Sequence, residues 1–284
     1  MIETKIIKDS IAPSGIRLTT FVLTFPRFIL PEFNTHRMFS RNASSSRAIP
    51  VHKMLEAVKN NPVIPLTFTK NQKGMQAFEM IADQESAKNA WLAGRDSAVA
   101  TVNELLNLGV HKQHANRPLE PYSWTSVVCT ATEYANFFAL RNHPMAQPEI
   151  AELAKQMWEA YKTNQPRAVQ EYEPHLPFVS DKELDDAKKS GDCIDQILNC
   201  FKKSVARCAR VSYLNHEGKQ PTWEEDLGLF NRLVGSAPIH ASPTEHQAWA
   251  LSTKERSGNF IGWKQYRKSL QGENVEIYNG PEEE

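Results

Sequence analysis

The sequence predicts an α+β fold in which long helices pack against a small antiparallel or mixed sheet. Two observations carry this prediction. Apolar residues recur at helical spacing over long stretches, whereas β-branched and aromatic residues are concentrated in a few short ones. Hydrophobic residues make up 40% of the 284 positions, which is enough for a buried core, and we expect a single domain over residues 1–284.

The N-terminal part holds the first predicted strands. Residues 1–35 include IRLTTFVLTFPRFIL, which favours strands, and Pro26 and Pro31 limit how far a ladder can continue. Residues 38–50 are polar and Ser-rich, so we expect an ordered loop there. Residues 51–58 are expected to form a short helix.

Helices dominate the rest of the chain. Apolar spacing from residue 75 to 108 predicts one long helix or two consecutive helices closed by Gly109. Residues 124–132 read as a buried strand. Further helices, with breaks near Pro144, Pro148, Ser190 and Gly191, are expected over residues 136–161, 182–210 and 223–234. The remaining expectations are a strand or helix over 246–251, a helical insertion or connector over 160–205, and a frayed acidic tail over 280–284.

Charge and composition exclude several classes of protein. The chain carries 33 Lys and Arg against 33 Asp and Glu, so its formal net charge is zero. A binder of long nucleic acid normally carries a basic excess, so we expect none here, and local charge must hold any anionic ligand. No stretch approaches the roughly 20 apolar residues that span a bilayer, and the first residues lack the apolar core of a signal peptide. We therefore expect a cytoplasmic protein without a membrane partner.

The four cysteines are expected to be reduced and structural, because none forms a CxxC pair. Cys129 lies in the apolar run VVCTA, which favours burial over nucleophilic chemistry. We expect no metal site, because neither His111 with His114 nor the residues between His240 and His246 have the spacing of a zinc site. The other cysteines recur at a spacing that predicts one buried helix face, namely Cys193, Cys200 and Cys208.

Three polar clusters are the candidate sites. Residues 35–47 hold three arginines, a histidine and several hydroxyls, a set of donors that suits a phosphate; a solvated Ser-rich loop is the alternative. In the second cluster, Arg141 emerges from an apolar segment, as it would for either an ion pair or an anionic ligand. In the third, HASPTEH, the residues Ser242 and Glu245 match a capping box, and a helix N-terminus also attracts anions. The chain contains no Rossmann or P-loop glycine motif.

These clusters resemble the motifs of the flavin-dependent thymidylate synthases (ThyX). The RHR motif of that family, followed by Ser and Arg, is similar to Thr35-His36-Arg37 with Ser45 and Arg47. The later family helix, with Asn, then Leu-Arg and Ala-Gln-x-Glu-Ile, is similar to residues 136–150. Ala115-Asn116-Arg117 resembles a third family segment.

The order of the motifs differs from the ordinary family. There, an Ala-Arg-Val-Ser-Phe segment and a His-Glu-Thr-Pro-Phe-Glu-His segment precede RHR, whereas similar segments here, residues 209–213 and 240–246, follow it. We therefore predict a circularly permuted, divergent, phage-type member of the ThyX-like fold, which neighbouring surface termini would permit.

The resemblance implies a homotetramer that binds FAD and dUMP at its subunit interfaces. The implied reaction is reductive methylation of dUMP, with methylenetetrahydrofolate as carbon donor and NADPH as reductant. Arg141 resembles the arginine that polarises the uracil and favours ionisation at N3. Ser45, Arg47 and Arg117 resemble dUMP contacts, the first two donated by a neighbouring chain. The residues that resemble FAD contacts are His36, Arg37, Asn136, Ser242, Glu245 and, more weakly, Ser212.

Several positions depart from the family pattern. Thr35 replaces the first Arg of RHR, Thr130 and Thr132 stand where the family has Asn-x-Arg beside the flavin, and Met145 occupies a common His position. These departures fall on cofactor contacts, so two alternatives to methylation stay open. One is C5 hydroxymethylation of dUMP or dCMP for modified bases, and the other is a nucleotide-binding relative without catalysis.

Overall fold

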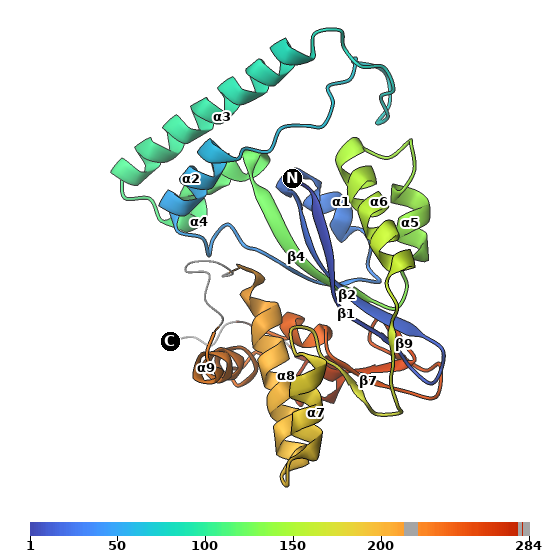
Figure 1. The fold of residues 1–284 in the computed structure, drawn as a ribbon. Coiled ribbons are helices and arrows are strands. Elements are labelled where there is room, and N and C mark those ends of the chain that lie inside the picture. Colours follow the sequence, from blue (N-terminus) through green and yellow to red (C-terminus); the bar gives the residue numbers. More distant parts are fainter. Residues whose placement is uncertain (213–220, 278–279, 281–284) are drawn as a thin grey trace.

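The computed structural model describes residues 1–212, 221–277 and 280, and it confirms the α+β class with a mixed main sheet (Figure 1). The strand order of this sheet is β3-β4-β2-β1-β5. Neighbouring strands are antiparallel, except that β5 runs parallel to β1. The strands are β1 (Glu3–Ile11), β2 (Arg17–Pro26), β3 (Ser40–Ala43), β4 (Trp124–Ala131) and β5 (Arg167–Ala168).

The central strand β2 gives the sheet two different faces. Because side chains alternate along a strand, Phe21 and Phe25 point to one face, where they are fully buried in the largest apolar cluster. Thr20 and Val22 point to the other face, where Thr20 bonds to Thr130 of β4.

Short helices cover the first face, beside the sheet in Figure 1. They are η1 (Arg27–Ile29), α1 (Leu30–Asn34), α5 (Ala135–Arg141) and α6 (Pro148–Thr163). The rings of Phe33 and Phe137 pack edge to face at 5.8 Å, and Ile150 and Met157 of α6 complete the cluster. This aromatic packing holds the end of α1 against α5.

The C-terminal part of the chain packs on the second face. A small sheet of order β10-β7-β6 lies there, and Val128 of β4 packs with Cys208 and Val211. The strands of this region are β6 (Pro174–His175), β7 (Ala248–Ala250), β8 (Arg256–Ser257), β9 (Phe260–Ile261) and β10 (Trp263–Gln265). Its helices are α7 (Asp181–Lys189), α8 (Cys193–Ala209), η3 (Arg210–Ser212), α9 (Trp223–Val234), η4 (Ser242–Glu245) and η5 (Tyr266–Ser269).

A third apolar cluster joins the long helix α3 to its neighbours, which lie together above the sheet in Figure 1. Val99 and Val102 of α3 pack against Leu119 and Val58. The elements of this cluster are α2 (Val51–Asn60), α3 (Gln84–Asn107), α4 (Lys112–Ala115) and η2 (Arg117–Tyr122).

Most of the long predicted elements are confirmed. The strand over β4, the short helix α2 and the helix α9 are present, and α5 and α6 are separated near Pro144 and Pro148 as expected. Helices α7 and α8 break at Ser190 and Gly191. Gly109 has a φ of +75°, which suits the residue that closes α3.

Two expectations near the N-terminus are wrong. Residues 30–34 form the helix α1 rather than a strand, because Pro31 lies in its first turn, where a missing N–H costs nothing. Ser40 to Ala43, expected in a loop, form β3, since their backbone pairs with the otherwise open edge of β4.

Two further expectations are wrong at helix starts. Residues 75–83 are not helical; Asp83 accepts a hydrogen bond from the Ser86 N–H and so caps α3 one residue before Gln84. Ser242 and Glu245 form no capping box, because η4 is a 3₁₀ turn preceded by Ala241 and has no side-chain cap.

The segments named as insertion and tail are described in part. Residues 160–205 contain the end of α6, the short strands β5 and β6, α7 and most of α8, and Phe201 is fully buried. Of the acidic tail, residues 281–284 lie outside the described residues. Cys129 and Cys208 are buried, and burial raises the pKa of the Cys129 thiol to about 12, which leaves no reactive thiolate there.

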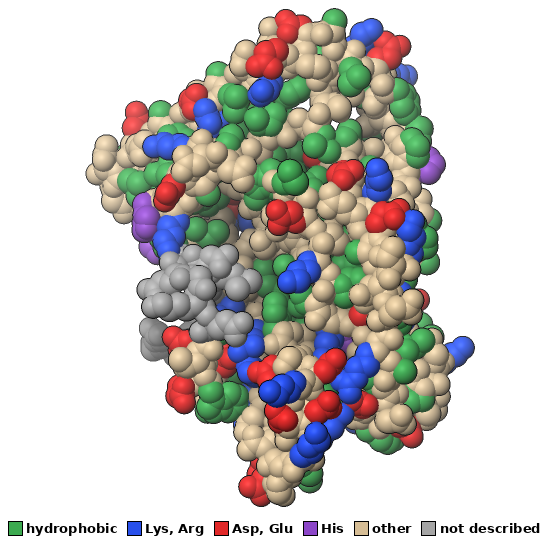
Figure 2. Space-filling model, viewed as in Figure 1, with side chains coloured by type: hydrophobic (Ala, Val, Ile, Leu, Met, Phe, Trp, Pro, Cys, Tyr) green, Lys and Arg blue, Asp and Glu red, His purple; other side chains and the backbone are tan. Residues whose placement is uncertain are grey.

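The surface in Figure 2 interleaves positive and negative side chains. Over α7 and the nearby edge of the sheet, Lys8, Arg167 and Lys188 form ion pairs with Asp181 and Glu173. Ion pairs thus neutralise charges locally on this part of the surface.

Candidate functional site

The first candidate site is the His36 cluster, which we define as His36, Phe39, Arg41, Phe137 and Arg141. His36 follows α1, and its ring stacks on Phe39 at 5.8 Å and meets Phe137 edge to face at 4.9 Å. Two aromatic rings from different elements therefore fix the position of the imidazole.

Arg141, the last residue of α5, contacts this ring directly. Its Nε donates a hydrogen bond to His36 Nε2 at 3.1 Å. Burial, with the charges of Arg141 and Arg41, lowers the pKa of His36 to about 4. The imidazole is therefore neutral at pH 7, as an acceptor of this bond must be. Among the described residues, no partner is found for the terminal nitrogens of Arg141.

Arg41 completes the cluster from β3. Its Nη1 donates to the carbonyls of Asn34 at 2.7 Å and His36 at 3.1 Å, and burial lowers its pKa. Within the described part of the chain it has no ion-pair partner. Sequence analysis assigned Arg41 no role apart from that of its cluster, although its place in a dense run of arginines and hydroxyls was a usable signal.

The second candidate site is the Glu120 cluster, defined as Arg27, Ser46, Arg117 and Glu120. Glu120 Oε1 accepts hydrogen bonds from the Ser46 hydroxyl and from Arg117 at 2.9 Å, and it forms an ion pair with Arg27 Nε at 3.3 Å. Two donors and a second arginine on one carboxylate oxygen form a compact polar centre. Sequence reasoning missed Arg27 and Glu120, whose only signal was their charge.

The loop that carries Ser45 and Arg47 is fixed to this centre. Asn116 donates to the carbonyls of Ser46 at 2.7 Å and Ile49 at 2.9 Å, and Asn116 itself is fully buried. Arg47 is exposed and has no ion pair or hydrogen bond to another described side chain, while Ser45 is half-buried. The predicted phosphate contacts therefore lie on a braced loop beside Arg117.

The predicted cofactor residues are only partly brought together. Glu245 forms an ion pair with Arg267 and couples electrostatically to Arg41, so η4 lies near the His36 cluster. Arg37, Asn136 and Ser242 are exposed. The side chain of Ser212 lies outside the described part of the structure.

The permuted motifs pack beside the N-terminal ones, as the permutation requires. Asn42 Nδ2 donates to the carbonyl of Cys208 at 3.4 Å. Gln265 Nε2 donates to the Ser40 hydroxyl at 3.3 Å and to the carbonyl of Glu245 at 3.1 Å. Residue 213 of the first permuted motif lies outside the described residues.

Two positions that depart from the family pattern have internal partners. The Thr130 hydroxyl bonds to Thr20 and to His246 Nδ1, both at 2.8 Å, within a fully buried polar chain. Thr132 accepts from the Ile261 N–H at 3.2 Å. Burial lowers the pKa of His246 to about 3, so its ring is neutral. Thr130 and Thr132 thus tie the two parts of the chain together.

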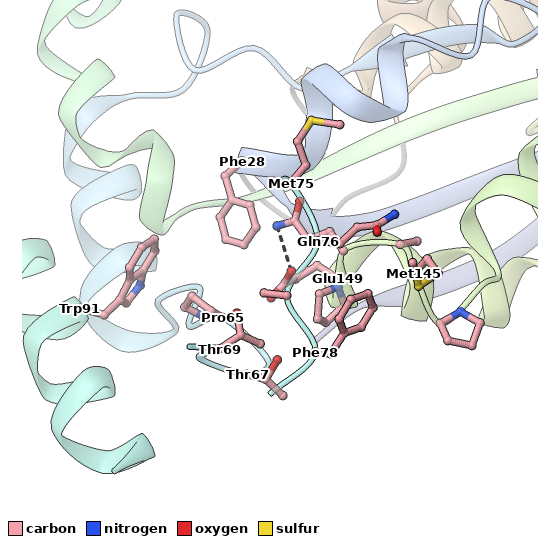
Figure 3. A pocket seen from close by; sticks show the side chains of 15 residues that line it. Phe28, Pro65, Thr67, Thr69, Met75, Gln76, Phe78, Trp91, Met145 and Glu149 are labelled. Atoms are coloured by element: carbon pink, nitrogen blue, oxygen red, sulfur yellow. Dashed lines mark hydrogen bonds between the residues drawn. The ribbon is translucent and has the colours of Figure 1, made fainter. Parts of the chain in front are cut away.

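A cavity of about 370 Å³ lies beside the residues that follow Arg141 (Figure 3). Phe28, Trp91 and Phe78 provide apolar walls, and Glu149 lies among them with only 3% of its surface exposed. Glu149 accepts from Gln147 at 3.1 Å and from the Leu66 N–H at 2.8 Å. A second cavity, of about 380 Å³, lies beside the Glu120 cluster.

The residues that resemble flavin contacts fit such a cofactor at an open surface. Arg37, Asn136 and Ser242 are exposed polar groups able to donate to phosphates or ring oxygens, whereas His36 and Glu245 already have partners inside the chain. None of these five lines the cavities described above. These residues therefore offer donors along the open surface of the chain rather than inside an enclosed pocket.

The described residues lack a metal-binding cluster and a helix that could span a membrane. They contain no group of three or more His, Cys, Asp and Glu side chains arranged to hold a metal ion. Over the same residues, no helix combines the length and apolar character needed to cross a membrane.

Comparison with known proteins gives one family match. The family model described as Thy1, thymidylate synthase complementing protein, matches residues 17–167, more than half of the chain. The chain is also similar to two crystal structures of the UMP/dUMP methylase PolB from Streptomyces cacaoi. The structure with 5-Br dUMP has 15% sequence identity and a TM-score of 0.47, covering 57% of this chain and 90% of that one. The structure with 5-Br UMP has 16% identity and a TM-score of 0.45, covering 57% and 89%. No curated protein matches the sequence.

Proposed function

The chain belongs to the Thy1 family of thymidylate synthase complementing proteins, and from that premise we propose that it is a flavin-dependent enzyme that methylates dUMP at C5 to give dTMP. The observation that carries this proposal is the state of Arg141. Its Nε is bonded to a neutral histidine, and its terminal nitrogens are left for a ligand.

Arg141 is the proposed catalytic residue. A fixed guanidinium beside a uracil stabilises negative charge on N3 and the neighbouring oxygens, and this raises electron density at C5. C5 then bonds to the one-carbon unit of methylenetetrahydrofolate and loses its proton, and the bond between that unit and the folate nitrogen breaks, which releases tetrahydrofolate. Reduction of that unit to a methyl group consumes one hydride, which NADPH provides. FAD, when bound, supplies the hydride-transfer chemistry, so no protein thiol is needed.

The remaining predicted residues bind and orient in this proposal. Ser45 and Arg47 hold the phosphate of dUMP on a neighbouring subunit, and Arg117 is a further dUMP contact. Arg37, Asn136 and Ser242 hold FAD, with His36 and Glu245 beside them. The assembly is a homotetramer with shared sites, and the fold of its single domain is a circular permutation of the ordinary ThyX order.

A second candidate is hydroxymethylation of dUMP or dCMP, in which water, rather than a hydride, adds to the one-carbon unit. Thr130 and Thr132 support this second candidate. Their positions contact flavin in the ordinary family, whereas here the two side chains form hydrogen bonds within the chain. A relative without catalysis is the third.

Purified protein with methylenetetrahydrofolate and either dUMP or dCMP, with and without NADPH, separates these candidates by product mass. Formation of dTMP that depends on NADPH supports the proposal, and a hydroxymethyl product supports the second candidate. Protein that lacks the flavin absorption band at about 450 nm, takes up no FAD and yields no product would contradict both the methylation and the hydroxymethylation proposals.

A further inference from the structure

We propose that His36 is a positioning residue for Arg141 rather than a cofactor contact: it holds the side edge of the guanidinium so that both terminal nitrogens are kept for the pyrimidine. This inference rests on the proposed function of Arg141. It assigns a task to the histidine that the family resemblance places at the flavin.

The bond geometry supports this assignment. A guanidinium has one N–H on Nε and a fork of two terminal nitrogens, and His36 Nε2 takes the hydrogen of Nε at 3.1 Å. A partner on Nε limits rotation of the planar group without using the fork. The fork is the part that donates two parallel hydrogen bonds, as recognition of adjacent acceptors such as O4 and ionised N3 of uracil requires.

The position of the imidazole is itself determined by its surroundings. Phe39 stacks on the ring and Phe137 meets it edge to face, while Arg41 donates to the carbonyl of His36. The ring is therefore held from three elements: the segment after α1, β3 and α5. Each contact leaves Nε2 available to Arg141.

The charges around the ring keep it an acceptor. Arg141 from α5 and Arg41 from β3 are the cations that act on it, and among the described residues no carboxylate forms an ion pair with it. A protonated His36 would carry an N–H on Nε2 facing the N–H of Arg141, so the bond would be lost. Neutral His36 is therefore needed for the arrangement, and burial with these charges gives it a pKa of about 4.

Two substitutions test the hydrogen-bond acceptor and the aromatic ring of His36 separately. His36→Phe keeps an aromatic ring between Phe39 and Phe137 but removes the acceptor, whereas His36→Gln removes the ring but offers a carbonyl oxygen to Nε. His143→Gln, an exposed histidine two residues beyond Arg141, is the matched control. Thermal unfolding and circular dichroism establish that each variant is folded.

The readout is ionisation of bound 5-fluoro-dUMP, whose ultraviolet spectrum changes when N3 loses its proton. In wild-type protein, a fixed Arg141 lowers the N3 pKa of the bound nucleotide. His36→Phe should return that pKa toward the free value by about 1 unit and lower turnover roughly tenfold, with a smaller change in nucleotide affinity. His36→Gln should recover much of the lost effect, and His143→Gln should match wild type.

The outcomes distinguish the two proposals. If wild-type protein binds no 5-fluoro-dUMP or leaves its N3 pKa unchanged, the proposed function fails. If wild-type protein lowers that pKa and folded His36→Phe lowers it equally, the positioning role alone is overturned. Should His36→Phe not fold, ¹⁵N-histidine spectra of wild-type protein decide: an unprotonated Nε2 at pH 7 supports the role, and a protonated Nε2 contradicts it.

Discussion

At the scale of single residues, the candidate site is defined by which donors are already used. His36 accepts a hydrogen bond from Nε of Arg141, and Glu120 accepts one from a terminal nitrogen of Arg117. Arg41 gives Nη1 to two carbonyls. The donors that remain on these side chains and on Arg47 are those that a nucleotide would meet.

Arg141→Ala should sharply lower turnover while leaving the fold intact, because the side chain is only half-buried and its one described partner is His36. Removal of a group that stabilises developing charge typically costs 10²–10³-fold in turnover, so about that loss is expected. Steady-state dTMP formation measures it, with thermal unfolding as the control for folding. Activity near the wild-type level would remove Arg141 from the catalytic role.

The sequence predicts the membership of the clusters better than it predicts the contacts of each side chain. His36 and Arg141 were both identified from sequence, but as separate contacts to cofactor and substrate. Their hydrogen bond joins positions 105 residues apart, and nothing local in either segment indicates it. Arg27 and Glu120 were missed for the same reason, since each acquires its partners only through the tertiary fold.

At the scale of elements, local signals decided which predictions succeeded. Helices α6, α8 and α9 have strong apolar periodicity and clear breaks, and all three are confirmed. β3 and α1 were missed because four or five residues carry little periodicity. The strand β3 exists only because β4, far along the chain, offers an edge to Ser40 and its neighbours.

Glu149 of α6 links that helix to the segment before α3, so its loss should destabilise the protein. Glu149→Leu would leave the Leu66 N–H and the Gln147 amide without their buried acceptor, at a cost of about 1–3 kcal/mol in the free energy of unfolding. Urea unfolding measures this cost. Glu159→Ala, at an exposed position of the same helix, should change stability by less than about 0.5 kcal/mol. Equal effects of the two substitutions would show that Glu149 provides no such link.

At the scale of the whole molecule, a buried polar chain joins the N-terminal sheet to the C-terminal part. It runs from Ser10 through His175, Thr20 and Thr130 to His246, with each hydrogen bond between 2.8 and 3.0 Å. All five side chains are at most 1% exposed. Strands β1 and β2 thereby hydrogen-bond to His175, and β4 hydrogen-bonds to His246, so the two parts should unfold together.

The buried polar side chains from Ser10 to His246 make the stability of the whole fold depend on pH. Burial lowers the pKa of His246 to about 3 and that of His175 well below its usual value, and the pKa of His36 is about 4, whereas an unfolded histidine has a pKa near 6.5. Between these values the unfolded chain binds more protons than the folded one, so stability is greatest above about pH 6.5 and falls as the pH drops toward 4. Carboxylates whose pKa is lowered in the fold, such as Glu183, reduce the stability further only as the pH falls below about 4.5.

Urea unfolding at pH 7, 6 and 5 tests this dependence in the range where histidines dominate it. Wild-type protein should lose stability steadily across that range. His246→Gln keeps a hydrogen-bonding partner for the Thr130 hydroxyl but cannot titrate, so its stability should fall less steeply with decreasing pH, even if it is lower at pH 7. His114→Gln, at an exposed position on α4, should keep the wild-type slope. An unchanged slope in His246→Gln would mean that His246 does not stay neutral within the fold and is not a source of the acid sensitivity.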